Sequence, residues 1–234
     1  AARSGLNAIA DLNRLDRPPI RIGALPTVSA LLMPRAVSRY LAEELQISIR
    51  ITTGENRVLL DQLRSDDLDL VIGRMPAPES MYGLNFEPLY RDVVVLAVHR
   101  SHPLADRQSL NPEEFARYPV LVPTPASIIA PYVERLFLEQ GIPQPNRVIE
   151  TVSDSFGRAF TRDFGAIWII SRGVISSELT TGEFVALPVD TQSTLGAVGL
   201  CVKANQQPES AVEIFATILR EEAQKLEFVI PRAA

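Results

Sequence analysis

Hydrophobic positions in the first third of the chain recur at two spacings, and the two spacings alternate. Short apolar runs at residues 20–25 and 68–72, and alternating isoleucines at positions 47, 49 and 51, predict strands. Apolar residues three or four positions apart over residues 28–44 and 58–63 predict helices between these strands, with Pro34 kinking or delaying the first helix. Two successive strand–helix–strand units predict a parallel sheet with right-handed crossovers.

The alternation of strands and helices continues to the C-terminus. A chain of 234 residues exceeds one typical core and suits two lobes of about 100 residues each. The pattern therefore predicts an α/β protein with two lobes. Further helices are expected at 109–115, 130–140, 154–163 and 210–226, and further strands at 84–89, 92–98, 120–123, 146–152, 166–170, 184–189 and 195–203.

Composition and charge narrow the kinds of partner. The net charge of −5 and the pI near 5.2 argue against this chain carrying nucleic acid by itself, because phosphate binding needs clustered lysine and arginine. No apolar run approaches the roughly 18 residues of a membrane span, so we expect no membrane partner. The chain begins without a methionine and without the apolar region of a signal peptide, which predicts a processed protein or a fragment of a longer one. The single cysteine, Cys201, rules out an internal disulfide and fits a reducing cytoplasm.

Residues 54–74 carry the most specific local signal. Gly54 ends an apolar segment, a helix with one apolar face follows, and an acidic turn leads into the strand at 68–72, which stops at Gly73 and Arg74. An open α/β sheet binds its ligand beyond the ends of its strands. This segment therefore predicts a small-molecule site, and Arg74 suggests an anionic ligand.

With the whole order of elements in view, the chain resembles the effector-binding domain of LysR-type transcriptional regulators. No single motif is diagnostic, whereas the ordered set with its spacing is specific and spans nearly the whole chain. The motifs are Ile-Arg-Ile-Gly at 20–23, Leu-Met-Pro at 32–34, Gly54, Asp-Leu-Asp-Leu-Val-Ile at 67–72, Glu-Pro-Leu-Tyr at 87–90, the segment 94–104, and Phe-Gly-Ala-Ile at 164–167. Within this family, the sequence Gly-Glu-Asn at 54–56 and the segment 83–90 are similar to the corresponding parts of two groups of regulators. These are the regulators of the pca (protocatechuate catabolism) operon and the galactose-binding-protein regulators.

The resemblance implies a domain organisation. It implies two Rossmann-like lobes joined by two crossover strands, as in periplasmic binding proteins, with effector in the cleft between them. Residues 1–17 would be the end of a linker helix, residues 18–96 and 197–228 lobe I, and residues 97–196 lobe II. The crossovers would fall near residues 97–98 and 195–197. A DNA-binding winged helix, absent from this chain, would precede the linker and make the only contact with DNA. Members of the family form homodimers or homotetramers, for which helices 29–44 and 130–140 are candidate contact surfaces. The alternative for both helices is simple packing on the sheet.

Candidate ligand contacts in the first lobe lie where strands turn into helices. Thr27, Ser29 and Asn56 occupy such turns, and free N–H groups at a helix start favour a carboxylate. The alternative for each is plain helix capping. Arg74 would pair with a carboxylate at the edge of the cleft, and its alternative is a surface salt bridge.

The second lobe offers Thr124, Ser127 and Phe156 as candidate effector contacts. Thr124 and Ser127 lie in a proline-bounded turn and could donate to a carboxylate, or they could simply form a structural turn. Phe156 would line the cleft or pack in the core. Asp154 is expected to cap a helix, because an acid would repel an anionic effector.

The sequence contains few signals for a catalytic site, a metal site or a cofactor site. The chain lacks nucleophile-elbow, P-loop, His-Glu-x-x-His and Cys-x-x-Cys motifs. His99 and His102 are expected beside the crossover, and their spacing alone does not predict a metal site. Trp168 and Cys201 are expected in the core. We therefore predict no catalytic residues, no metal and no cofactor.

The sequence thus predicts a cytoplasmic effector-sensing and oligomerisation domain that binds a small anionic metabolite, such as an aromatic acid or a ring-cleavage carboxylate. One alternative is a periplasmic-type solute-binding protein that transports a small anion, which upstream sequence with a signal peptide would support. A second alternative is a small enzyme on the same two-lobed fold, which an acid–base pair in the cleft and measurable turnover would support.

Overall fold

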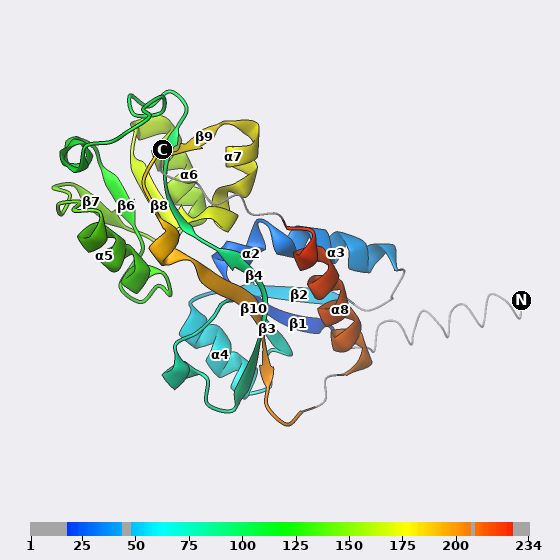
Figure 1. The fold of residues 1–234 in the computed structure, drawn as a ribbon. Helices are drawn as coiled ribbons and strands as arrows, with labels where there is room; N and C mark the ends of the chain where they lie inside the picture. Colours follow the sequence, from blue (N-terminus) through cyan, green and yellow to red (C-terminus); the bar gives the residue numbers. More distant parts are fainter. Residues whose placement is uncertain (1–17, 44–47, 207–208, 227–234) are drawn as a thin grey trace, which may run out of the picture.

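Each of the two lobes of the protein is built around one five-stranded mixed sheet (Figure 1). The structure is a computed structural model that describes residues 18–43, 48–206 and 209–226. Three predicted features lie wholly or partly outside the described residues. They are the end of a linker helix at residues 1–17, the last residue of the helix 28–44, and the first residue of the strand 47–52.

Lobe I has the strand order β2-β1-β3-β10-β4. Its first three strands are parallel, as predicted, and β10 runs antiparallel to both β3 and β4. The strands are β1 (Ile20–Ala24), β2 (Ile49–Thr53), β3 (Leu70–Arg74), β4 (Leu84–Asp92) and β10 (Gly196–Lys203), and the helices are α2 (Pro26–Ser29), α3 (Leu32–Ala42), η1 (Pro78–Ser80), α4 (Asn56–Arg64) and α8 (Ser210–Gln224).

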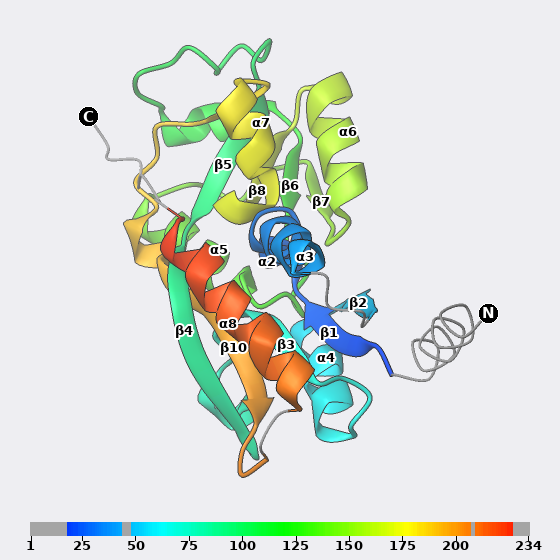
Figure 2. The same ribbon diagram turned by 90° about the vertical axis from the view of Figure 1, so that its right-hand side faces the viewer.

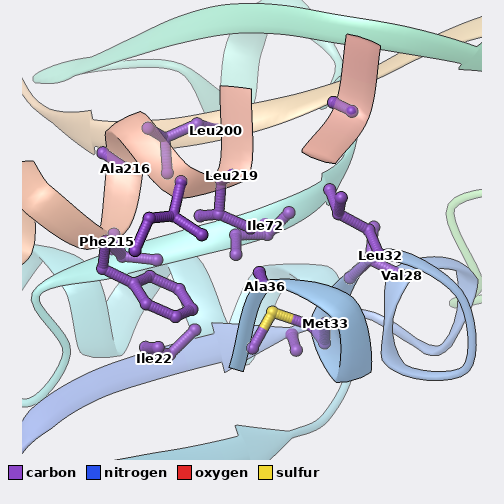
Figure 3. Close-up of a cluster of buried hydrophobic side chains, with 14 of the residues drawn as sticks. Ile22, Val28, Leu32, Met33, Ala36, Ile72, Leu200, Phe215, Ala216 and Leu219 are labelled. Carbon is purple, nitrogen blue, oxygen red and sulfur yellow. The ribbon is translucent and has the colours of Figure 1, made fainter. Parts of the chain in front are cut away.

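Helices cover both faces of the lobe I sheet (Figure 2). The apolar faces of α3 and α8 enclose one core cluster, in which Met33 and Phe215 pack against the strand residues Ile22, Ile72 and Leu200 (Figure 3). The opposite face is closed by α4, whose leucines pack with Cys201. Cys201 is 3% exposed, and burial raises the pKa of its thiol to about 12, so the thiol is neutral at physiological pH.

Lobe II repeats the arrangement with the strand order β7-β6-β8-β5-β9. Here β6, β7 and β8 are parallel, and β5 runs antiparallel to β8 and β9. Trp168 lies in the core on one face of this sheet. The elements are β5 (Val94–His99), η2 (Pro112–Arg117), β6 (Val120–Val122), α5 (Ala130–Glu139), β7 (Val148–Glu150), α6 (Asp154–Phe164), β8 (Ile167–Ser171), η3 (Arg172–Ile175), α7 (Ser176–Thr181), β9 (Phe184–Ala186) and η4 (Gln192–Thr194).

Two predicted helices differ in detail. The helix expected over 28–44 is two helices, α2 and α3, and Pro34 is the third residue of α3. Proline is tolerated in a first helical turn because the N–H groups there have no intrahelical acceptor. The helix expected at 109–115 is the 3₁₀ turn η2, which begins after a capping box formed by Asn111 and Glu114.

The chain crosses between the lobes earlier than predicted. The paired strands β4 and β10 lead to the two crossings (Figure 2). β4 pairs within the lobe I sheet as far as Asp92, whereas β5 pairs within the lobe II sheet from Val94. The first crossing is therefore at Val93, and residues 97–98 lie inside β5. The second crossing is formed by η4 and Leu195, directly before β10.

The two histidines lie away from the crossing, contrary to the prediction. His99 ends β5 and His102 follows it in a turn. The ring of His102 lies 4.4 Å from that of Tyr118, and burial lowers the pKa of this imidazole. Within the described ranges, no group of three or more His, Cys, Asp or Glu residues could hold a metal ion. No described helix is both long and apolar enough to cross a bilayer.

Candidate functional site

A cavity of about 710 Å³ lies between the two lobes. Lobe I lines it with the turns that follow β1 and β2, and lobe II lines it with the segments that follow β6, β7 and β8. All five are parallel strands whose carboxyl ends point to the cleft, which is where an open α/β sheet binds ligands. The cavity therefore occupies the position at which the sequence predicts effector binding.

The lobe I wall brings together three predicted residues, Thr27, Ser29 and Asn56. Thr27 lies within α2 and is 4% exposed. The Ser29 hydroxyl donates a hydrogen bond to the carbonyl of Leu25, at 3.0 Å. Capping, the alternative for Asn56, is not what the structure shows, because Glu55 is the N-cap of α4 and Asn56 is its first residue.

The start of α4 has unused hydrogen-bonding capacity. The first intrahelical bond runs from the N–H of Leu59 to the carbonyl of Glu55, so the N–H groups of residues 56–58 have no intrahelical acceptor. The Oδ1 atom of Asn56 is buried and has no hydrogen-bond partner in the described part of the chain. An amide can present either its oxygen or its NH₂ group to a ligand. This wall can therefore bind an anion or a polar group.

The lobe II wall is lined by Ser127, as predicted, and by the start of α6. Ser153 caps α6, because its hydroxyl accepts a hydrogen bond from the N–H of Phe156 at 3.3 Å. Asp154, expected as the cap, is instead the first residue of the helix. Burial raises the pKa of the Asp154 carboxyl, Glu178 raises it further, and Arg158 opposes the shift.

Arg158 is a cation of the cavity wall that the sequence reasoning missed. Its Nε lies 2.5 Å from Oε1 of Glu178, and its Nη2 donates to the carbonyl of Val174. Because Arg158 is paired with Glu178, the lobe II wall does not present an unpaired positive charge at this position. The spacing was a usable signal, because a residue four positions after Asp154 lies on the same helix face.

Three predicted residues lie outside the cavity lining among the described residues. Arg74 is 1% exposed and lies beside the lobe crossing, so the surface salt bridge considered as its alternative is not observed. Thr124 is half-buried, and its hydroxyl has no hydrogen-bond partner in the segments described. Phe156 is 41% exposed and stacks on Phe160 at 5.4 Å between ring centres.

Comparison with known proteins agrees with this geometry. The model of the LysR substrate binding domain family matches residues 13–224. The HTH-type transcriptional regulator PcaQ of Agrobacterium fabrum is 45% identical over 226 residues, which cover 97% of this chain and 73% of that protein. The effector binding domain of QuiR in complex with shikimate superposes with a TM-score of 0.72 at 21% identity, over 90% of this chain and 99% of that one. The CcmR regulatory domain of Synechocystis PCC6803 in complex with 2-PG gives a TM-score of 0.75 at 18% identity, with the same coverage.

Proposed function

We propose that this chain, which belongs to the LysR substrate binding domain family, binds a small carboxylic acid in the cavity between its lobes. It is the effector-binding domain of a LysR-type transcriptional regulator, and its relatives are regulators rather than enzymes or transport proteins. In the proposed mechanism the acid bridges the lobes and changes their relative angle, because it binds one arrangement more tightly than the other. The change would reach DNA in the cytoplasm through an N-terminal winged helix outside this chain.

The observation that carries this proposal is the free start of α4 in the lobe I wall. Its N–H groups lack intrahelical acceptors, and the positive end of a helix dipole favours a carboxylate. Thr27 and Asn56 lie at the two helix starts of this wall. We therefore place the carboxylate of the effector against lobe I, between these two side chains.

The lobe II wall favours a different chemical group. Asp154 would repel a second carboxylate, whereas its oxygens can accept hydrogen bonds from hydroxyl groups. The Arg158 guanidinium is already paired with Glu178. A carboxylate at one end and hydroxyl groups at the other describe a hydroxylated carboxylic acid. The aromatic class rests on the resemblance to regulators of the pca operon, in keeping with the similarity to PcaQ.

A thermal-shift screen tests the proposed ligand class. The panel pairs hydroxylated aromatic and alicyclic acids, shikimate among them, with their deoxy analogues and with their neutral amides. A ligand at 100 times its Kd should add about 2.7 kcal/mol to the free energy of unfolding. We expect hydroxylated acids to raise the Tm most and the amides least. Equal shifts for acids and amides would contradict carboxylate recognition.

We also propose that the domain assembles as a homodimer or homotetramer. The predicted contact helices α3 and α5 each expose a leucine, with Leu41 64% exposed and Leu138 84% exposed. On α6, Phe156, Phe160 and Phe164 form an aromatic row whose last member is 67% exposed. Exposed apolar rows of this kind mark protein contacts. Sedimentation velocity at micromolar concentration should show a dimer or tetramer, and Phe164→Glu should shift it toward the monomer. A monomeric wild-type domain would contradict this proposal.

A further inference from the structure

Two buried charged side chains, Arg74 and Asp92, lie beside the lobe crossing. Each is 1% exposed. Arg74 ends β3, and Asp92 ends β4 immediately before the first crossing at Val93. Burying a charge is costly unless other groups compensate it. The effector cavity does not account for these two charges, because Arg74 and Asp92 are absent from its lining among the described residues.

Arg74 contacts both crossings and the second lobe. Its Nη2 donates to the carbonyl of Asp92 at 3.4 Å in the first crossing, and to the carbonyl of Thr194 in the second. Its guanidinium carbon lies 4.4 Å from the ring centre of Tyr132 on α5 of lobe II. A Cβ atom on Gly196 would lie 2.6 Å from Nη2, so a larger residue there would displace the guanidinium. One lobe I side chain thus joins three segments at the hinge.

The crossings are also joined directly to each other. The Thr194 hydroxyl accepts a hydrogen bond from the N–H of Val94 at 2.9 Å and donates one to the carbonyl of Thr191 at 2.7 Å. Asp92 Oδ1 accepts a hydrogen bond from the N–H of Gly173, in η3 of lobe II, at 3.2 Å. Asp92 therefore extends the connection from the crossings into the second lobe.

The same residues reach the wall of the cavity. A Cβ atom on Gly173 would lie 2.5 Å from the carbonyl oxygen of Thr27, so the backbones of the two lobes are in close contact at this point. Ser171 lies directly before η3, is 1% exposed and lines the cavity together with Thr27. A continuous set of contacts thus runs from the cavity through η3 to Asp92 and Arg74.

We infer that Arg74 and Asp92 are positioning residues that hold the two lobes at one relative angle and thereby set the response to effector without touching it. The inference rests on the proposed function, because it concerns the regulation of the same cavity. Spatial continuity alone does not establish coupling, which requires an element with two arrangements that the site biases. The angle between the lobes is that element, and the separate contacts of Arg74 and Asp92 at the crossings stabilise one of its values.

The test measures the angle directly and needs no ligand. Spin labels on Thr217→Cys in α8 and Glu134→Cys in α5 report the distance between the lobes, since both positions are exposed and the native Cys201 is buried. In Asp92→Asn and Arg74→Met we expect a broader distance distribution with a shifted mean. The control, Arg220→Met, breaks an ion pair with Glu87 inside lobe I and should leave the distribution unchanged.

Stability is measured alongside, because removing a buried charged side chain leaves its buried hydrogen-bond partners unsatisfied, which is destabilising. Thr194→Val keeps both charged side chains and removes only the hydroxyl with its two hydrogen bonds, to Val94 across the crossings and to Thr191. This variant should fold if the charge variants do not. Distributions equal to wild type in every folded hinge variant would overturn the inference. If no acid in the screen raised the Tm but the hinge variants shifted the distance distribution, the result would count against the proposed function and not against this inference.

The pH dependence of the same distance distribution provides a second test of the inference. Burial raises the pKa of the Asp92 carboxyl to about 6, while Arg74 from β3 and the hydrogen bond from the Gly173 N–H oppose the shift. Tyr90 from β4 also interacts with Asp92, and its pKa is raised too, so it stays neutral. Below pH 6 the Asp92 carboxylate loses its charge. The distance distribution of the wild type at pH 5 should therefore match that of Asp92→Asn at pH 7.5. A wild-type distribution identical at both pH values would contradict a role for this charge.

Discussion

Replacing Thr27 by valine is expected to weaken binding of the best acid from the screen by about 10- to 100-fold, because a hydrogen bond to a charged group contributes about 1.5–3 kcal/mol. Valine keeps the shape of threonine and removes only the hydroxyl that we place against the carboxylate. Thr27 is 4% exposed and lines the cavity, so the change removes a donor from a nearly buried part of the cavity wall. Isothermal titration calorimetry measures the loss.

The matched control for this variant is Thr180→Val in α7. The Thr180 hydroxyl donates to the carbonyl of Ser176 at 2.8 Å, and residue 180 lies outside the cavity lining. We expect its affinity to equal that of wild type and the Tm of Thr27→Val to stay nearly unchanged. Full affinity in Thr27→Val would remove Thr27 from the site.

Gly173→Ala should separate the lobes where the backbone of Gly173 lies against that of Thr27. The new Cβ would lie 2.5 Å from the carbonyl oxygen of Thr27, and a backbone atom cannot rotate away as a side-chain end can. Relief requires η3 to move from α2, which shifts the cavity walls apart and weakens the Asp92–Gly173 hydrogen bond. Overpacking of this kind destabilises a packed arrangement by about 1–3 kcal/mol. Because the acid has to bind with the two walls close together, we expect most of this cost to oppose binding and the affinity to fall by about tenfold or more.

Gly182→Ala separates this effect from a general loss of stability. Gly182 has a φ of +72°, and no atom lies within 4 Å of the Cβ that alanine would add. Alanine there should lower the stability of the domain by about 1 kcal/mol through backbone strain and leave the affinity unchanged. If calorimetry showed equal affinities for Gly173→Ala and wild type, the lobe contact would have no part in binding.

Local patterns were sufficient to predict the order of strands and helices, and the family resemblance added the two-lobed fold with its cleft. Turns between parallel strands and helices lie at one edge of a sheet, so strand order together with that resemblance predicted Thr27, Ser29 and Asn56 on one wall. Ser127 followed from the same reasoning in lobe II. All four line the cavity.

Features that depend on long-range contacts could not be predicted in this way. The buried guanidinium of Arg74 bonds to carbonyl groups that lie 18 and 120 residues away in the chain. No local sequence pattern reveals such distant partners, so the burial of Arg74 could not be predicted. The crossing at Val93 is the first residue of the apolar run that continues into β5, and nothing in the run itself separates Val93 from the strand. Only the pairing of β4 and β5 with different sheets shows that the chain changes lobe there. Arg158 was within reach of helical spacing, but its pairing with Glu178 on α7 was not.

The most direct test of the account is a crystal structure of the domain with the acid that gives the largest thermal shift. The account predicts that the acid lies between the lobes, with its carboxylate within hydrogen-bond distance of the Thr27 hydroxyl and the first N–H groups of α4. Its hydroxyl groups would face Asp154. An acid bound outside this cavity, or bound with its carboxylate against Asp154, would contradict the account.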